Sequence, residues 1–237
     1  MTDQAGGLDK LIELSKVDVL LAQITLEKRK IDAELHARRE AVKAQDQKRE
    51  AKLRIVEERR VRYNREEKLV TGEKEKLVDR RKALTTLGSY KLQQAASKEI
   101  DYASKQLSTR EEATLTLLQE LSVLEKELQE LEGVVLAIKG ELEAFEKDAA
   151  HTLGSLAERA TEYVGQRPAL AAAVTQSQVL VHYDRVRHRY PLDPIVAVSE
   201  AQSCTGCRMK VGPQVFVQIS RGEIVKCPGC GRLLKLP

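Results

Sequence analysis

Two long segments of the sequence repeat apolar residues every seven positions, and this pattern restricts the fold more than any other feature. In the first segment, one heptad phase runs from Leu21 to Leu84, and eight of its ten positions are apolar. In the second, apolar residues recur at alternating steps of three and four from Leu117 to Ala149. Because this spacing keeps one face of an α-helix against a partner helix, both segments are predicted to form coiled-coil helices.

The stretch Thr-Thr-Leu-Gly-Ser-Tyr at residues 85–90 separates the two segments. Threonine, glycine and serine supply turn and capping chemistry, so we predict that the tip of an antiparallel hairpin lies there. Residues 28–82 carry a net charge of +8 and residues 99–148 a net charge of −8, and folding back at the tip places these opposite charges side by side. Each exposed ion pair contributes only ~0.2–1 kcal/mol. The charges are therefore expected to select partner and register, while the apolar seam supplies most of the stability.

The composition suits elongated helices better than a large round core. Charged residues make up 32% of the chain and aromatic residues 3%, and tryptophan is absent. A coiled-coil seam needs little aromatic volume because it is built from aliphatic side chains. No stretch reaches the ~20 apolar residues that cross a bilayer, and residues 1–10 lack the features of a secretory signal. We therefore expect a soluble, cytoplasmic protein that does not insert into membranes.

The pattern changes after Tyr163. Gly165 and Pro168 are expected to end the second long helix, so that the coiled-coil hairpin covers residues 1–167. Residues 168–193 are predicted to form a short helix and a linker. Residues 194–237 contain all four cysteines and are predicted to form a small β domain.

The cysteines have the spacing Cys204-x2-Cys207-x19-Cys227-x2-Cys230. Two residues between paired cysteines form a tight turn that brings both sulfurs to about 2.3 Å from one metal ion, and this arrangement is typical of zinc sites with four cysteine ligands. Strands predicted at 195–198, 214–219, 223–226 and 233–236, with a hairpin turn at residues 221–222, complete a zinc ribbon. We therefore predict one structural Zn²⁺ bound by these four cysteines.

Other chemistry for the cysteine pairs is less well supported. Neither pair follows a parallel strand at the start of a helix, as a thioredoxin-type redox motif would. A catalytic zinc keeps an open coordination position, whereas four cysteines close the shell. The sequence also lacks a glycine-rich phosphate-binding loop and a Ser/His/Asp set that a globular core could assemble into a catalytic triad. None of its four histidines is spaced from another metal-binding residue as a metal ligand would be. We therefore expect a protein that is not an enzyme and has no catalytic residues.

Residues 203–236, SCTGCRMKVGPQVFVQISRGEIVKCPGCGRLLKL, resemble the C-terminal domain of bacterial C4-type zinc-ribbon proteins, in which a long helical hairpin precedes the ribbon. Residues 89–101 and 179–202 are similar to the stretches that follow the tip and lead into the ribbon, although Ser89 replaces an expected glutamate. The resemblance implies an adaptor protein. Relatives in Helicobacter and Chlamydia are linked to flagellar or type III secretion assembly, to the alternative sigma factor of flagellar transcription and, in one line, to flagellin messenger RNA.

Two functional hypotheses stay open at this point, beside a purely structural spacer. In the first, the chain is an adaptor or scaffold that docks protein partners through the ribbon, where Phe216 is a candidate contact, or through the hairpin tip. In the second, the ribbon region binds RNA, because residues 179–237 carry a net charge of +5. The candidate contacts for RNA or for a partner are basic: Arg208, Lys210, Arg221, Lys226 and Arg232. The sequence does not decide whether the hairpin self-associates.

Overall fold

The structure, a computed structural model, describes residues 3–237, with side chains from residue 7 onward. It confirms a mainly α-helical fold with a small β-sheet near the C-terminus. The elements in chain order are α1 (Asp3–Leu84), α2 (Tyr90–Ala172), α3 (Ser177–Arg189), β1 (Ile195–Ala197), α4 (Pro213–Ser220), β2 (Val225–Lys226) and β3 (Leu233–Lys235). None of the described helices is both long and apolar enough to span a membrane.

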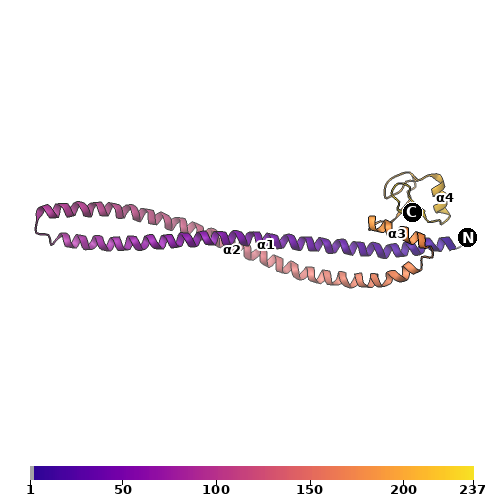
Figure 1. The fold of residues 1–237 in the computed structure, drawn as a ribbon, viewed down its shortest axis with the longest axis horizontal. Coiled ribbons are helices and arrows are strands. Elements are labelled where there is room, and N and C mark those ends of the chain that lie inside the picture. The colour runs from indigo at the N-terminus through magenta and orange to yellow at the C-terminus, as the bar shows by residue number, and fades with distance from the viewer. Residues whose placement is uncertain (1–2) are drawn as a thin grey trace. The chain divides into compact units, whose positions relative to one another are not determined.

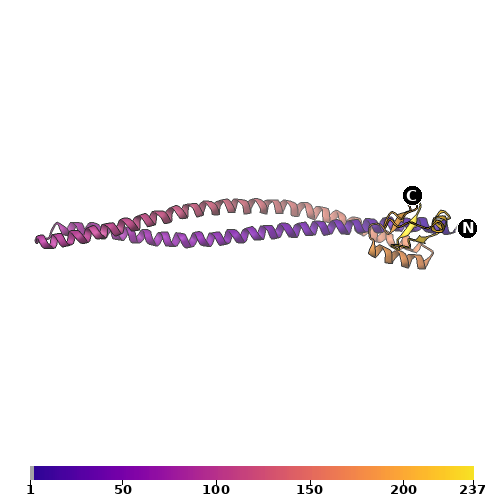
Figure 2. The same ribbon diagram turned by 90° about the horizontal axis from the view of Figure 1, so that it is seen from above.

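The chain divides into two compact units. One contains residues 37–144, which are the central parts of α1 and α2 and the turn between them, and the other contains the start of α1 through His36 together with residues 145–237. In the first unit, α1 and α2 lie side by side and are joined at the tip, as Figures 1 and 2 show. We call this unit the hairpin unit and the other the base unit.

Local hydrogen bonds close the turn of the hairpin unit at residues 85–89. The Thr85 hydroxyl donates to the Lys82 carbonyl at 2.7 Å, and the Thr86 hydroxyl donates to the Ala83 carbonyl at 2.8 Å, so the last turn of α1 does not leave these acceptors open. At the start of α2, the backbone amide of Gln93 donates to the backbone carbonyl of Ser89 at 2.9 Å. The two threonine side chains thus cap the end of α1, and the Ser89 backbone carbonyl accepts the first hydrogen bond of α2.

The predicted seven-residue phases form the seam of the hairpin unit. From α1, Val56, Val70 and Leu77 are buried, and they share one heptad phase. From α2, the buried residues at seven-residue spacing are Ile100, Leu107, Thr114, Leu121, Leu128 and Val135. Thr114 is the polar member of this series, and its hydroxyl is satisfied because it donates to the Arg110 carbonyl at 2.8 Å.

Opposite charges on the two helices of the hairpin unit pair, as the charge asymmetry predicts. Four ion pairs join a basic residue of α1 to a glutamate of α2: Lys52–Glu127, Arg59–Glu120, Arg60–Glu125 and Lys74–Glu111. Two basic residues of α2 reverse this polarity. Lys139 pairs with Asp46, and Arg110 pairs with Glu66 and Glu73. Acidic residues of the basic helix α1 thus also pair with basic residues of the acidic helix α2.

These pairs are expected to fix register at small energetic gain. Arg59 Nη1 lies 2.7 Å from Glu120 Oε2, and both side chains remain partly exposed. A double-mutant cycle with Arg59→Ala and Glu120→Ala should therefore give a coupling energy of about 0.2–1 kcal/mol in denaturant unfolding. The control cycle pairs Arg59→Ala with Glu130→Ala, which should show no coupling. A coupling well above this range would mean that charge, not the apolar seam, dominates the stability of the hairpin unit.

In the base unit, the predicted end of the second long helix is wrong. Helix α2 continues through Gly165 and Pro168 to Ala172, and α3 begins only at Ser177. A proline inside a helix costs roughly 3 kcal/mol, but the final turn of α2 contributes Leu170 and Ala171 to a buried cluster. This burial offsets the lost hydrogen bond, so tertiary packing overrides the local signal.

That buried cluster joins four segments of the base unit. Leu11 and Leu14 of α1 are fully buried and pack with Val174, with Tyr183 of α3 and with Leu233 of β3. Figure 2 shows the start of α1, α3 and the C-terminal segment close together. The C-terminal segment is therefore packed directly on the starting turns of the first helix.

The sheet of the base unit has the order β1-β3-β2, with β1 parallel and β2 antiparallel to the central β3. The strand predicted at 214–219 is wrong, because these residues belong to α4, and residues 221–222 consequently end a helix instead of turning a hairpin. Pro213 at the first helical position favours a helix. The partly buried Val215 and Phe216 and the buried Ile219 lie on one helical face that packs against the sheet.

Candidate metal centre

The four cysteines meet in the base unit although they come from two loops. Cys204 and Cys207 follow β1, whereas Cys227 follows β2 and Cys230 precedes β3. Their four sulfur atoms all lie within 4.8 Å of one another, and none is in a disulfide. Cys204 and Cys227 are buried, Cys230 is half-buried and Cys207 is exposed. The site thus lies at the edge of a small core.

The two cysteine pairs adopt the same backbone turn. In the first, the Cys204 carbonyl accepts from the Arg208 amide at 2.7 Å, and in the second the Cys227 carbonyl accepts from the Gly231 amide at 2.9 Å. The residue four positions after the first cysteine has a positive φ in both turns, 64° at Arg208 and 77° at Gly231. Glycine adopts this conformation freely, whereas Arg208 does so at a cost of about 1 kcal/mol.

The sulfur positions fit one tetrahedral zinc ion. Zinc–sulfur bonds of about 2.3 Å in tetrahedral geometry place neighbouring sulfurs about 3.8 Å apart. The Cys204–Cys230 and Cys207–Cys227 sulfur pairs are 3.9 and 3.6 Å apart. Four thiol ligands are a donor set that zinc prefers, and they leave no coordination position for water or substrate. The site therefore fits one structural Zn²⁺.

The surroundings of the thiols make metal binding dependent on proton release. Burial raises the pKa of the Cys227 thiol to about 12 and also raises the pKa of Cys204. For Cys230 burial acts in the same direction, but the Arg232 amide and the neighbouring thiols outweigh it and lower the pKa to about 7. Because a divalent cation binds thiolates, the metal must displace protons from the buried sulfurs.

Residues 203–234 match the family model of the C4-type zinc ribbon domain. The stretch is a zinc ribbon. The match covers both cysteine pairs and α4, and it agrees with the ligand geometry. It confirms the resemblance that the cysteine spacing and the surrounding residues indicated.

The whole chain has the fold of three solved structures. The first is the CT398 protein from Chlamydia trachomatis, with a TM-score of 0.80, 17% identity and full coverage of both chains. A Mycobacterium smegmatis protein gives a TM-score of 0.72 at 19% identity with the same coverage, and the HP0958 protein from Helicobacter pylori gives 0.60 at 17% identity over 97% of each chain. Identities this low establish a shared fold alone. No curated protein sequence matches the chain.

Arg232, one of the candidate contacts for RNA or a partner, is largely buried. Arg232 is only 8% exposed, and its guanidinium stacks on the Tyr190 ring, 3.7 Å from the ring centroid. It also forms an ion pair with Asp193 at 3.0 Å. A Cβ added at Gly206 would lie 2.5 Å from Arg232 Nη1, so a larger residue there would force the arginine side chain to move. Arg232 thus places a positive charge beside Cys230, where a zinc ion bound by four thiolates would carry two net negative charges.

The other candidate contact residues remain at the surface of the zinc ribbon. Arg208, Lys210, Arg221 and Lys226 are exposed, whereas Phe216 is only half-exposed because it packs on the core of the ribbon. A separate hydrogen bond joins α3 to the second cysteine pair. His182 Nε2 of α3 is 2.9 Å from the Gly231 carbonyl oxygen, which ties α3 to the metal-binding turn.

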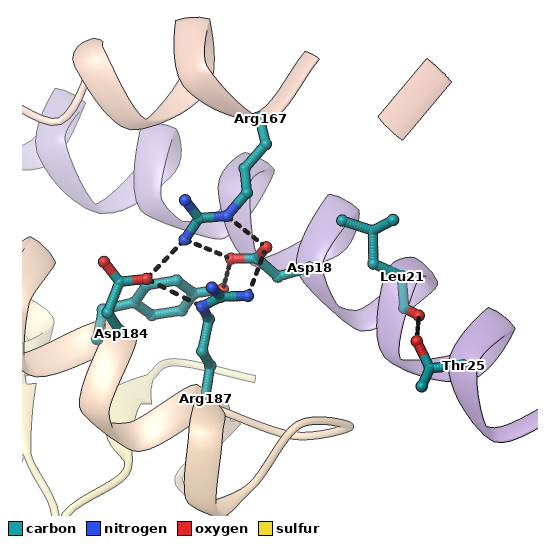
Figure 3. A network of polar contacts seen from close by, with 7 residues as sticks. Asp18, Leu21, Thr25, Arg167, Asp184 and Arg187 are labelled. Atoms are coloured by element: carbon teal, nitrogen blue, oxygen red, sulfur yellow. Dashed lines mark hydrogen bonds and ion pairs between the residues drawn. The ribbon is translucent and has the colours of Figure 1, made fainter. Parts of the chain in front are cut away.

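Figure 3 shows a partly buried ionic network in the base unit that was not predicted from the sequence. The Asp18 side chain of α1 is 1% exposed and accepts a hydrogen bond from Arg167 Nε of α2 at 2.8 Å. From α3, Arg187 Nη1 and the Tyr183 hydroxyl donate to the same carboxylate at 3.1 and 3.0 Å. Both arginines also bind Asp184, at 2.6 and 2.9 Å. Two carboxylates and two guanidinium groups thus neutralise one another between three helices.

One signal in the sequence points to this network. Asp18 follows Leu11 and Leu14 at steps of three and four, so it occupies a position where the seam calls for an apolar side chain. A charged residue at such a position needs a buried partner. Burial, together with the Asp18 carboxylate, raises the pKa of the Tyr183 hydroxyl well above its usual value, so Tyr183 stays protonated and donates.

Proposed function

We propose that this chain is a non-enzymatic, zinc-binding adaptor that works in the cytoplasm and holds protein partners on a rigid scaffold. The observation that carries the proposal is the way the zinc ribbon is built into the base unit. Leu233, which follows the last zinc ligands, packs on Leu11 and Leu14 of α1, and the Asp18 network joins α1, α2 and α3. In this proposal, a metal site with four cysteine ligands stabilises the packing between the ends of two long helices and takes part in no reaction.

The process in which such an adaptor acts is part of the same proposal. The resemblance to zinc-ribbon proteins linked to flagellar or type III secretion assembly favours a role in building or regulating such a system, with a secretion component or a sigma factor as the partner. Exposed basic side chains on the ribbon and exposed apolar side chains on the hairpin unit offer separate surfaces for this purpose.

The test is capture of interacting molecules by the full-length chain from the cells that produce it. The extract is treated with nuclease in one arm and left untreated in the other, and both protein and RNA are identified. An adaptor is expected to retain the same stoichiometric protein after nuclease treatment and at 0.5 M salt. Capture of RNA alone, or of proteins that disappear with nuclease, would contradict the proposal.

The second candidate function, RNA binding, has one observation in its favour. Arg208, Lys210, Arg221 and Lys226 are all exposed on the zinc ribbon. Under the adaptor proposal, replacing Arg208, Lys210 and Arg221 together with alanine removes only weak, nonspecific RNA affinity and leaves the zinc content unchanged. If RNA is the ligand, each lost phosphate contact lowers the slope of log affinity against log salt by about 0.7. Titration of a single-stranded RNA at several salt concentrations distinguishes these outcomes.

A further inference from the structure

The end of the hairpin unit near the turn is strongly basic. Between residues 76 and 98 there are six lysines or arginines and a single acidic residue, Asp79. All six basic side chains are exposed. From residue 80 to residue 98 the chain has no carboxylate side chain at all. The positive potential of this end therefore has little internal compensation.

A groove lies between α1 and α2 on this end of the hairpin unit. Its floor is apolar and consists of the buried Leu77 and Leu107 and the half-buried Ala103. Its volume is about 640 Å³. We call it the tip groove, and its remaining lining residues are Glu73, Lys76, Arg80, Lys98, Glu99, Tyr102 and Gln106. An apolar floor beneath charged walls is the form of a surface that accepts one face of an amphipathic segment.

The cations of the tip groove are available to a ligand. Lys76, Arg80 and Lys98 make no ion pair within the described part of the chain. By contrast, Glu73 is already paired with Arg110. Among the charged lining residues of the described chain, three basic side chains and one acidic side chain, that of Glu99, thus form no ion pair.

Exposed aromatic and apolar side chains are frequent in the first turns of α2, which lead to the groove. Tyr102 lines it and is 68% exposed, and Tyr90 at the start of α2 is 80% exposed. The chain has only eight tyrosine and phenylalanine residues and no tryptophan, so two exposed tyrosines within 13 residues stand out. Tyrosine is enriched among the residues that dominate binding energy in protein interfaces. Leu92, 59% exposed, adds to this surface.

We propose that the tip groove binds an acidic amphipathic helix of the partner protein. The inference rests on the proposed adaptor function and names its docking surface and the chemistry of its ligand. Apolar side chains of the incoming helix pack on Leu77, Ala103 and Leu107, and its flanking carboxylates meet Lys76, Arg80 and Lys98. A third helix in the groove between two helices repeats the packing geometry of the hairpin itself.

The lining favours a protein ligand over RNA. A phosphate backbone needs a continuous cationic track, whereas the carboxylates of Glu73 and Glu99 interrupt this one. The floor is aliphatic, and Tyr102 is the one aromatic residue that lines the groove. Aliphatic floors match leucine-like side chains, while single-stranded RNA binds where aromatic platforms stack successive bases.

The test places a photo-reactive group in the groove of the full-length protein. p-Benzoylphenylalanine is introduced at position 102 in cells that naturally produce the chain, at position 136 as a control, and at position 217 to report on the zinc ribbon. Leu136 is 75% exposed on α2 and Val217 is 47% exposed on α4. After irradiation, the cross-linked segment is mapped by mass spectrometry. We expect a protein adduct at position 102 but not at 136, attached to a helical segment with a net negative charge.

The mapped segment is then synthesised and titrated against variants of the full-length chain. Charge reversal of the three groove cations should weaken binding at least tenfold, whereas a matched reversal of three exposed cations elsewhere on α1 should change it less than twofold. The test variant is Lys76→Glu/Arg80→Glu/Lys98→Glu, and the control variant is Lys48→Glu/Arg54→Glu/Arg65→Glu. Circular dichroism verifies that both variants keep their helices.

The outcomes separate this inference from the adaptor proposal. An RNA adduct at position 102, a segment without net negative charge, or equal weakening by both variants would overturn the inference. Protein adducts at 217 without any at 102 would also overturn it, while leaving the adaptor proposal standing with the ribbon as its docking surface. Absence of protein adducts at both positions would count against both.

Discussion

Replacing Cys227 with serine is expected to abolish zinc retention and to unfold the zinc ribbon, while the hairpin unit stays helical. The ribbon core is small, and two of its buried members, Cys204 and Cys227, are themselves ligands. Metal binding in comparable small sites supplies on the order of 10 kcal/mol of folding free energy. The hairpin unit has its own buried seam and needs no metal. Elemental analysis gives the zinc content, and hydrogen exchange gives the protection of each segment.

The loss should extend beyond the ribbon into α3. Leu233, Ile195 and Ile224 of the ribbon region pack in the same cluster as Tyr183, and His182 contacts Gly231. Amides of residues 177–189 should therefore exchange faster in the Cys227→Ser protein. Thr205→Ser is a matched control between the ligands, because serine keeps the hydroxyl that bonds the Ala197 carbonyl. Stoichiometric zinc in a variant that lacks all four cysteines, or melting of residues 37–144, would contradict the expectation.

Replacing Asp18 with alanine should destabilise the base unit by about 1–3 kcal/mol, because the buried Tyr183 loses its acceptor and the two arginines are left with Asp184 alone. The Asp18 carboxylate is almost completely buried and binds Arg167, Arg187 and Tyr183. Truncating Asp18 costs more than the network contributes, since two guanidinium groups then share the single carboxylate of Asp184. Denaturant unfolding monitored at the tyrosines, together with hydrogen exchange of α3, measures the effect.

Two companion variants make this result specific. Asp32→Ala removes an exposed aspartate from the same helix and should change stability by less than 0.5 kcal/mol or so. Asp18→Asn keeps the shape and an acceptor for Tyr183 but removes the charge, so it should fall between the wild type and Asp18→Ala. Equal free energies of unfolding for the Asp18→Ala and Asp32→Ala proteins would show that the network does not contribute to the stability of the base unit.

Features with a local or periodic signature were predictable from the sequence. The heptad phase that contains Val56, Val70 and Leu77 forms the seam, because a repeated spacing determines a helix face regardless of the partner. The cysteine pairs meet as expected, since each pair carries its own turn chemistry. The strands at β1 and β3 were likewise found from short runs of β-branched and aliphatic residues.

Features that depend on distant contacts were not predictable in this way. The segment at 214–219 offers Val215, Val217 and Ile219 in alternation, which indicates a strand, but the adjacent Phe216 is also needed to cover the ribbon core, and only a helix presents Val215, Phe216 and Ile219 on one face. Asp18 and Arg167 are 149 positions apart, so no local pattern pairs them. Arginine is mostly found at protein surfaces, so a buried Arg232 was not expected. Its partners, Tyr190 and Asp193, are distant in the sequence, so no local pattern pairs them with Arg232.

The packing of Leu11 and Leu14 against Leu233 also determines the order in which the chain can fold as it is synthesised. The turn at 85–89 allows the hairpin unit to zip from the tip as soon as α2 leaves the ribosome, because its contacts are close in sequence near that turn. The cluster around Leu11 and Leu14 is complete only after β3 has been synthesised, which at ~5–20 residues per second is a delay on the order of 10 s or more. During that interval Val174 and Tyr183 can pack on Leu11 and Leu14, but Leu233 cannot. A chain that stalls before residue 233 leaves this cluster without Leu233, so the base unit is expected to gain its full stability only when β3 is added.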